Sequence, residues 1–209
     1  RDEKWHKLPF AGERYPDVKG VHDRRAAEIT LEEALEYTYV MVEGGQSIKG
    51  VDLVGGKFST SDFQTFIANT NGVEVVDNGT SVQAYLEVLA QGQSPSTAYE
   101  FDAKRGLDID FFDIGRKASE LAKTSLNGIK IDKQQTEMVL APYAFADIID
   151  NSLIPSLDAL EVQQGRSYFI DKLGEQVASE LLDVTDSGLL KGGLATARSD
   201  DEGVPSRET

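Results

Sequence analysis

The sequence has no cysteine, and only two of its 209 residues are histidines. Without cysteine, the chain offers no disulfide, no thiolate metal ligand and no cysteine nucleophile. His6 and His22 are 16 positions apart, whereas helical zinc motifs place two histidines one turn apart on the same face. Serine catalysis is not supported either, because the G-x-S-x-G pattern is absent and histidine bases are few.

Long apolar runs and basic residues are also scarce. No apolar stretch approaches the roughly 20 residues that cross a bilayer, and no signal peptide is recognised, so we expect no membrane partner. The 21 Lys and Arg residues are outnumbered by 36 Asp and Glu residues, which gives a net charge of −15. Such a field repels a phosphate backbone, and the longest basic cluster is only Arg24-Arg25. Nucleic acid is therefore not expected as a direct ligand.

What is present indicates a folded protein. Hydrophobic residues make up 40% of the chain and charged residues 27%, which is an ordinary globular composition. Helix-like and strand-like patterns occur in separate stretches rather than in strict alternation. This favours an α+β fold, an antiparallel sheet meander with several packed helices, over a doubly wound parallel sheet.

Three helices are predicted after an extended arm over residues 1–28, whose Trp5, Phe10 and Tyr15 suggest that the arm lies on a covering surface. The first helix follows the Thr30/Glu33 capping box and ends at Gly44-Gly45. The second is capped by Asp108 or Asp110 and closed by Asn127-Gly128. The third begins at Pro142 and is broken by Pro155.

The strands are predicted from an alternating pattern between Ser47 and Ala90. Asn71-Gly72 and Asn78-Gly79 are typical of tight hairpin turns, so about four strands are expected there. Short strands are also expected at Ile129, at Ile131 and over 138–140.

Two further patterns have an ordinary structural interpretation. Gly50–Phe58 lacks the Lys and Ser/Thr spacing of a phosphate loop and is interpreted as a turn between strands. Asp108, Asp110 and Asp113 lack the glycine and glutamate of a calcium loop and suit a helix N-terminus.

The acidic run Asp200-Asp201-Glu202 leaves two interpretations open. Its carboxylates could bind a cation or a peptide amine, but three acids before a Gly-Val-Pro turn are more often a solvated loop. The run lies in the stretch Gln163–Thr209, which is dense in glycine, acids and turn signals.

This stretch and several earlier segments resemble the TldD/PmbA family, once called modulators of DNA gyrase. The resembling segments are, in order, Ala68–Glu74, Ala98–Asp102, Met138–Pro142, Gln164–Phe169, Asp171–Ser179, Lys191–Leu194 and Asp200–Pro205. The resemblance implies an α+β fold and a role in a cytoplasmic heteromeric metallopeptidase. One subunit type, TldD, carries zinc on an H-E-x-x-x-H helix with a cysteine further along. The other type, PmbA or TldE, pairs with it and lacks those ligands.

Here the expected zinc helix departs from that motif. Counted from 139–142, Asp150 and Asn151 stand at the positions of the His-Glu pair, and Pro155 stands at that of the second histidine. Asp150 could ligate a metal, but Pro155 cannot. The chain thus resembles the PmbA/TldE type, with zinc expected only in a TldD-type partner, and no catalytic, cofactor-binding or metal residue is carried over.

The resemblance also predicts a division of the chain and several possible roles. We expect an arm over 1–28, an α+β domain over 29–140, and a helix with short strands over 141–209 that begins a truncated C-terminal domain. The chain is then a fragment, since family members are about twice as long. The expected role is a zinc-free subunit that partners TldD, or itself as a dimer, in acting on peptides or unfolded proteins. A homodimeric peptidase and a gyrase-modulator-type protein-interaction module are the alternatives.

Overall fold

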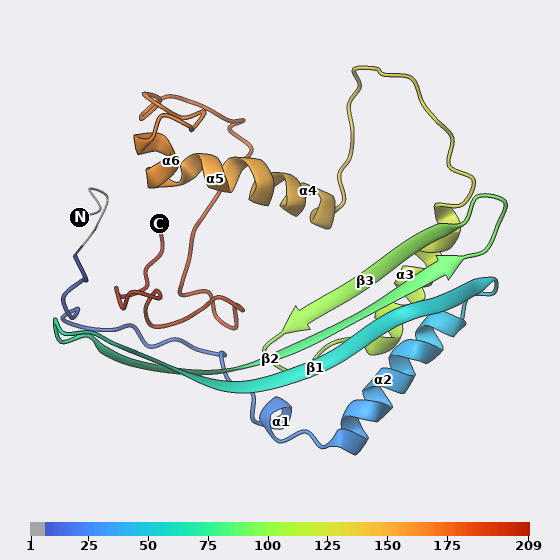
Figure 1. Ribbon diagram of the computed structural model, residues 1–209, viewed down its shortest axis with the longest axis horizontal. Helices are drawn as coiled ribbons and strands as arrows, with labels where there is room; N and C mark the ends of the chain where they lie inside the picture. Colours follow the sequence, from blue (N-terminus) through green and yellow to red (C-terminus); the bar gives the residue numbers. More distant parts are fainter. Residues whose placement is uncertain (1–6) are drawn as a thin grey trace. The chain divides into compact units, whose positions relative to one another are not determined.

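The computed structural model describes residues 7–209, so the predictions for Trp5 and His6 lie outside the described residues. The chain forms two compact units (Figure 1). The first contains the residues up to Ile129 together with Thr185–Thr209, and the second contains Lys130–Val184. Each unit is described separately below.

The first unit is built on an antiparallel meander. Strand β1 (Val51–Ala68) pairs with β2 (Glu74–Ala90), which pairs with β3 (Ser96–Lys104), in the order β1-β2-β3. The α+β prediction with an antiparallel meander is confirmed. The prediction of about four strands is wrong, because the stretch Ser47–Ala90 forms one long hairpin of two strands.

The two Asn-Gly dipeptides have different roles in this hairpin. Asn71-Gly72 forms the turn as predicted: Gly72 has φ +87°, and the Asn69 carboxamide oxygen accepts hydrogen bonds from the N–H groups of Asn71 and Val73. Asn78-Gly79 forms no turn and lies inside β2. At Gly79 an added Cβ would come within 2.7 Å of Arg105 Nη1 and 2.8 Å of Phe63 Cζ. Glycine at this position allows the side chains of Arg105 and Phe63 to pack closely against the backbone of β2.

Helices α2 (Leu31–Gln46) and α3 (Phe111–Thr124) pack on one face of the sheet (Figure 1). Alternate residues of β2 point toward them, because side chains on a strand alternate between the two faces. Tyr37 of α2 stacks on Phe111 of α3 with ring centroids 4.7 Å apart, and Phe58 of β1 meets Phe111 edge-on at 5.3 Å. The buried core consists mainly of Met41, Val82, Ala84, Leu86, Val88, Ala90, Ile114, Ala118 and Ala122.

Helix α2 begins as predicted but ends later. Gly44 and Gly45 belong to the helix, which continues to Gln46, so the prediction that they end it is wrong. Both glycines are buried against α3, where a Cβ on Gly44 would overlap the carbonyl oxygen of Phe112. Ser119 Oγ of α3 donates to Gly45 O at 2.7 Å. The pair therefore permits a close helix crossing and does not terminate the helix.

The Thr30→Ala variant is expected to destabilise the first unit by about 1 kcal/mol. Thr30 Oγ1 accepts from Glu33 N–H at 3.2 Å, while Thr30 N–H donates to the Glu33 carboxylate at 3.0 Å. Alanine leaves the Glu33 N–H without this acceptor. Urea unfolding followed by circular dichroism measures the change. Thr124→Ala, which removes an exposed hydroxyl at the other end of a helix, is the control. Equal midpoints for the two variants would contradict the role of the cap.

Helix α3 begins at a predicted cap, Asp110, but ends at Thr124, before the predicted closing pair Asn127-Gly128. Asp110 is its N-cap and accepts from Asp113 N–H at 2.9 Å, and Asn127 adopts a left-handed φ of 57° just after the helix. Hydrogen bonds from Lys117 and Arg116 lower the pKa of the Asp113 carboxyl below its ordinary value. Asp110 and Asp113 thus serve the helix N-terminus as interpreted from the sequence, whereas Asp108 lies before the helix and pairs with Lys104 at 3.3 Å.

The arm and the segment 185–209 both line the distal part of the β1–β2 hairpin. Carbonyls of Leu8 and Pro9 accept from the side chains of Asn71 and Asn69, and the short helix α1 (Arg24–Ala27) follows the arm. Tyr15 is half-buried, and its hydroxyl donates to Gly203 O at 2.9 Å. Phe10 is 77% exposed, so the prediction that the arm's aromatic rings are covered is wrong for this residue.

Arg105 holds the segment 185–209 onto the sheet. Its buried guanidinium donates to the carbonyls of Thr80, Gly193, Leu194 and Thr196. Burial lowers the pKa of Arg105 from its ordinary value, but a guanidinium remains charged in proteins. Four carbonyl oxygens from two distant parts of the chain therefore share one cation.

The second unit is a helical segment with little internal packing. Helix α4 (Pro142–Ile148) continues through the π-helical turn η1 (Ile149–Leu153) into α5 (Ile154–Leu157), and α6 (Ala159–Gln163) follows. The prediction that Pro155 breaks the helix is wrong, because the helix continues past Pro155 to Leu157. The Ile154 N–H bonds to Ile149 O in the wider π register, and Pro155 follows as the second residue of α5.

The short strands predicted near Ile129, Ile131 and 138–140 are not formed. Residues 128–141 have no regular secondary structure, and Ile129 is 84% exposed. A strand requires a hydrogen-bonding neighbour, and none lies beside these residues in the described chain. Their β-branched side chains alone therefore do not produce a strand.

Candidate functional site

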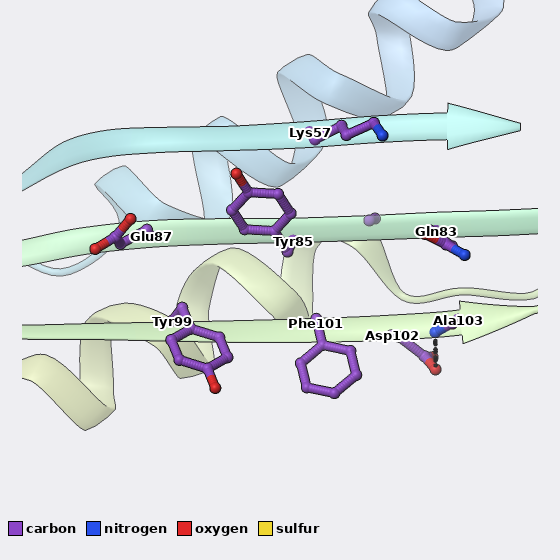
Figure 2. Close-up of a pocket in the computed structure, with 9 residues that line it drawn as sticks. Lys57, Gln83, Tyr85, Glu87, Tyr99, Phe101, Asp102 and Ala103 are labelled. Carbon is purple, nitrogen blue, oxygen red and sulfur yellow. Dashed lines mark hydrogen bonds between the residues drawn. The ribbon is translucent and has the colours of Figure 1, made fainter.

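A groove of about 700 Å³ lies on the sheet face opposite α2 and α3. Three aromatic rings on β2 and β3 line it, together with Lys57 of β1 and Glu87 of β2 (Figure 2). The antiparallel register brings these residues together in two neighbouring rows. One row is Lys57–Tyr85–Phe101, and the other is Gly55–Glu87–Tyr99.

The aromatic rings form an exposed platform. Tyr99 and Phe101 stack with centroids 6.3 Å apart and planes inclined by 25°. Tyr85 is 41% exposed, Tyr99 61% and Phe101 38%. Single exposed apolar residues are common, but several partly exposed aromatic rings side by side on one sheet face indicate a contact surface. The platform can bind flat or apolar groups through ring faces, and the tyrosine hydroxyls add polar contacts.

Charges of both signs border the platform. The Asp102 carboxylate accepts from the Ala103 N–H at 2.8 Å and lies 3.8 Å from the Lys104 ammonium. Lys57 and Glu87 form no ion pair within residues 7–209, and Figure 2 shows the Lys57 ammonium extending away from Glu87. The Glu87 carboxylate is therefore available to a ligand.

Gly55 leaves open space beside Glu87. It pairs directly with Glu87 across β1 and β2, next to a bulge between Leu53 and Gly55. A Cβ added to Gly55 would meet no heavy atom within 4 Å. The strand surface is therefore bare on that side of the carboxylate, and a bound chain could approach there without displacing a side chain.

No residue of this groove was predicted from the sequence to be a site residue, although Tyr99, Phe101 and Asp102 lie in the family-like segment Ala98–Asp102. The usable signal was the pair of alternations Tyr85/Glu87 and Tyr99/Phe101, in which every second position is aromatic or charged. Alternation predicts that such residues share a face of one strand. It does not give the register, which alone sets Tyr85 opposite Phe101 and Glu87 opposite Tyr99.

The segment expected to carry a zinc helix is helical, but its side chains do not fit a zinc site. Asp150 and Asn151 are exposed in the π-helical turn η1. The Asn151 amide donates to the carbonyl and carboxylate of Asp147, and Pro155 has no ligating side-chain atom. Within residues 7–209, no three His, Cys, Asp or Glu side chains are grouped closely enough to hold a metal ion.

The remaining sequence candidates are structural elements. Asp200 Oδ1 accepts from the N–H groups of Glu202 and Val204 and closes a tight turn in which Gly203 has φ +90°. Gly50–Phe58 enters strand β1, so it is no phosphate loop, and the predicted turn is limited to its first residue. Gly50 has φ +74° and precedes the strand.

Family models match nearly all of this architecture. The PmbA/TldA metallopeptidase central domain matches residues 22–126, and the PmbA/TldA metallopeptidase C-terminal domain matches residues 133–209. The chain belongs to the PmbA/TldD family. The first match contains the whole meander with α2 and α3, and the second contains the π-helical segment and the segment anchored by Arg105.

Curated relatives of this PmbA/TldD family chain are archaeal and bacterial. An uncharacterized protein of Methanocaldococcus jannaschii is 29% identical over 94% of this chain and 46% of its own length. The metalloprotease TldD homolog of Buchnera aphidicola is 25% identical over 74% of this chain and 35% of its own length. The chain thus spans about half the length, or less, of these curated relatives.

Solved structures share the fold. TldE from Thermococcus kodakarensis superposes with a TM-score of 0.87 at 24% identity, covering 99% of this chain and 47% of that one. A candidate modulator of a DNA gyrase from Thermotoga maritima gives a TM-score of 0.89 at 21% identity, covering 100% of this chain and 49% of that one. None of the helices formed by the described residues combines the length and apolar character needed to span a bilayer.

Proposed function

We propose that this chain is a PmbA/TldE-type component of a TldD/TldE-type metallopeptidase that acts on peptides or unfolded proteins in the cytoplasm. The observation that carries this proposal is the side-chain set at the zinc-motif positions. Asp150, Asn151 and Pro155 provide one carboxylate, one amide already bonded to Asp147, and one residue without a ligand atom. Zinc prefers nitrogen, sulfur and carboxylate ligands. The catalytic metal of such an assembly then belongs to a TldD-type partner.

Exposed apolar side chains support a role in assembly. None of the residues in α4, η1, α5 and α6 is buried. Phe145 and Ile148 of α4 lie three positions apart, so they share a helix face, and they are 44% and 48% exposed. Contiguous apolar surface of this kind marks protein interaction sites in soluble proteins. A protein partner explains it better than DNA, which the net charge of −15 disfavours.

The experiment is reconstitution of the full-length chain with a TldD-type subunit from the same source. Size-exclusion chromatography should give one complex, and metal analysis should assign about one zinc to each TldD-type subunit and none to this chain. Peptidase activity should require the TldD-type subunit. Two chains that elute separately would refute the proposal. Stoichiometric zinc in this chain by itself would instead favour the homodimeric peptidase.

A further inference from the structure

We propose that the groove on the outer sheet face binds a basic side chain, arginine in preference to lysine, of an extended peptide. This inference rests on the peptide-handling function proposed above and names a substrate preference within it. Tyr85 precedes Glu87 by two residues on β2, and Tyr99 lies directly opposite Glu87 on β3. Glu87 therefore has two aromatic neighbours on one sheet face, Tyr85 along its own strand and Tyr99 across on β3 (Figure 2).

This combination suits a guanidinium better than other groups. A guanidinium stacks on an aromatic face and donates two parallel hydrogen bonds to a carboxylate at the same time. An ammonium is a compact point charge that makes the ion pair without the planar stacking. Directly paired strand residues have Cβ atoms about 5 Å apart, so Tyr99 and Glu87 can contact one side chain together.

The surroundings leave this carboxylate open to such a ligand. Glu87 has no ion-pair partner within residues 7–209, and the Lys57 ammonium extends away from it (Figure 2). Gly55, which pairs with Glu87 on β1, has no side chain. No heavy atom lies within 4 Å of the position that a Cβ on Gly55 would take. A peptide backbone can therefore run beside Glu87 while its basic side chain lies on the rings.

Charge complementarity selects the occupant. The chain carries a net charge of −15, so a second copy is repelled and a basic peptide is attracted. Attraction by net charge alone would not distinguish one glutamate from another. Binding of arginine in this groove requires Glu87 and the adjacent rings in addition to the net charge.

The test measures fluorescence anisotropy of end-blocked, neutral-dye peptides with the full chain alone. The peptides are identical except for a central Arg, Lys or Gln between valines. The Arg peptide is expected to bind about tenfold more tightly than the Gln peptide at low ionic strength, with Lys between them. Glu87→Gln and Tyr99→Ala should each abolish most of this preference, and Gly55→Leu should weaken all three peptides by occupying the open space.

Glu43→Gln is the matched control, because Glu43 is an exposed glutamate of α2 and its loss changes the net charge equally. It should leave the preference intact, and circular dichroism should show all variants folded. Equal affinity for the Arg and Gln peptides, or an unchanged preference in Glu87→Gln, would overturn the inference. Since no partner is present, these results are separate from the reconstitution. If the chain joins its partner but shows no preference for arginine, only the arginine inference is overturned. If it prefers arginine but joins no partner, only the proposed assembly is overturned.

Discussion

Gly115→Ala is expected to destabilise the first unit by roughly 3 kcal/mol, although alanine is the better helix former by about 1 kcal/mol. Gly115 lies in the second turn of α3 and faces the end of α2. An added Cβ would overlap the carbonyl oxygen of Met41 and the backbone nitrogen of Gly45. Backbone atoms cannot rotate aside as a side chain can. The two helices must therefore separate, which also breaks the Ser119–Gly45 hydrogen bond.

Urea unfolding followed by circular dichroism measures this effect, with Gly55→Ala as the matched control. Gly55 has open space around its Cβ position and no positive φ. Its replacement should change the free energy of unfolding by about 1 kcal/mol at most, toward greater stability. If Gly115→Ala unfolds at the same urea concentration as the unmodified chain, α2 and α3 do not approach each other as closely as described.

Arg105→Met is expected to release the segment 185–209 from the sheet and to cost about 3–5 kcal/mol. Methionine fills much of the volume but donates no hydrogen bond. The carbonyls of Thr80, Gly193, Leu194 and Thr196 then lose a shared charged donor at a site where Thr80 and Thr196 are buried. Arg105→Lys should recover only part of the loss, because one ammonium cannot reach all the acceptors around the edges of the guanidinium.

Hydrogen–deuterium exchange with mass spectrometry locates this change. Peptides from 185–209 should exchange much faster in Arg105→Met, while those from β2 near Val88 change less. The control is Arg24→Met, because Arg24 pairs with Glu28 on the surface with 84% of its side chain exposed. Loss of such a pair costs at most about 0.5 kcal/mol. Unchanged exchange over 185–209 would refute the anchoring role of Arg105.

Features fixed by neighbouring residues were predictable from the sequence. The Thr30/Glu33 capping box, the Asp110 cap, the left-handed Asn127 and the Asn71-Gly72 turn each depend on hydrogen bonds or φ angles within a few positions. The same Asn-Gly pattern wrongly predicted a turn at Asn78-Gly79, which lies inside β2. The Gly-Gly pattern wrongly predicted a helix end at Gly44-Gly45, which lies inside α2. In both places the glycine is required by a distant partner: the Arg105 and Phe63 side chains at Gly79, and α3 at Gly44.

The candidate groove also combines features that local sequence patterns predict with features that depend on distant contacts. Alternation along β2 and β3 placed Tyr85 with Glu87, and Tyr99 with Phe101, on single strand faces. Which face carries the groove depended on where α2 and α3 packed. Which residues met across the strands depended on the register, including the bulge beside Gly55. These facts arise from contacts between residues far apart in the chain, and local patterns do not specify them.

By itself, the sequence determined the α+β class, the family and the acidic character, and it predicts that Asp150, Asn151 and Pro155 stand at the zinc-motif positions. Each of these follows from residue identity and short-range order. The tertiary structure alone decided that the long hairpin has two strands, that Pro155 follows a π-helical turn, and that Arg105 holds 185–209 in place. It also placed Glu87 next to Tyr85 and Tyr99 on one sheet face (Figure 2). The physical reason is that burial, close backbone approach and strand register are properties of paired segments, which acquire them only when the chain has folded.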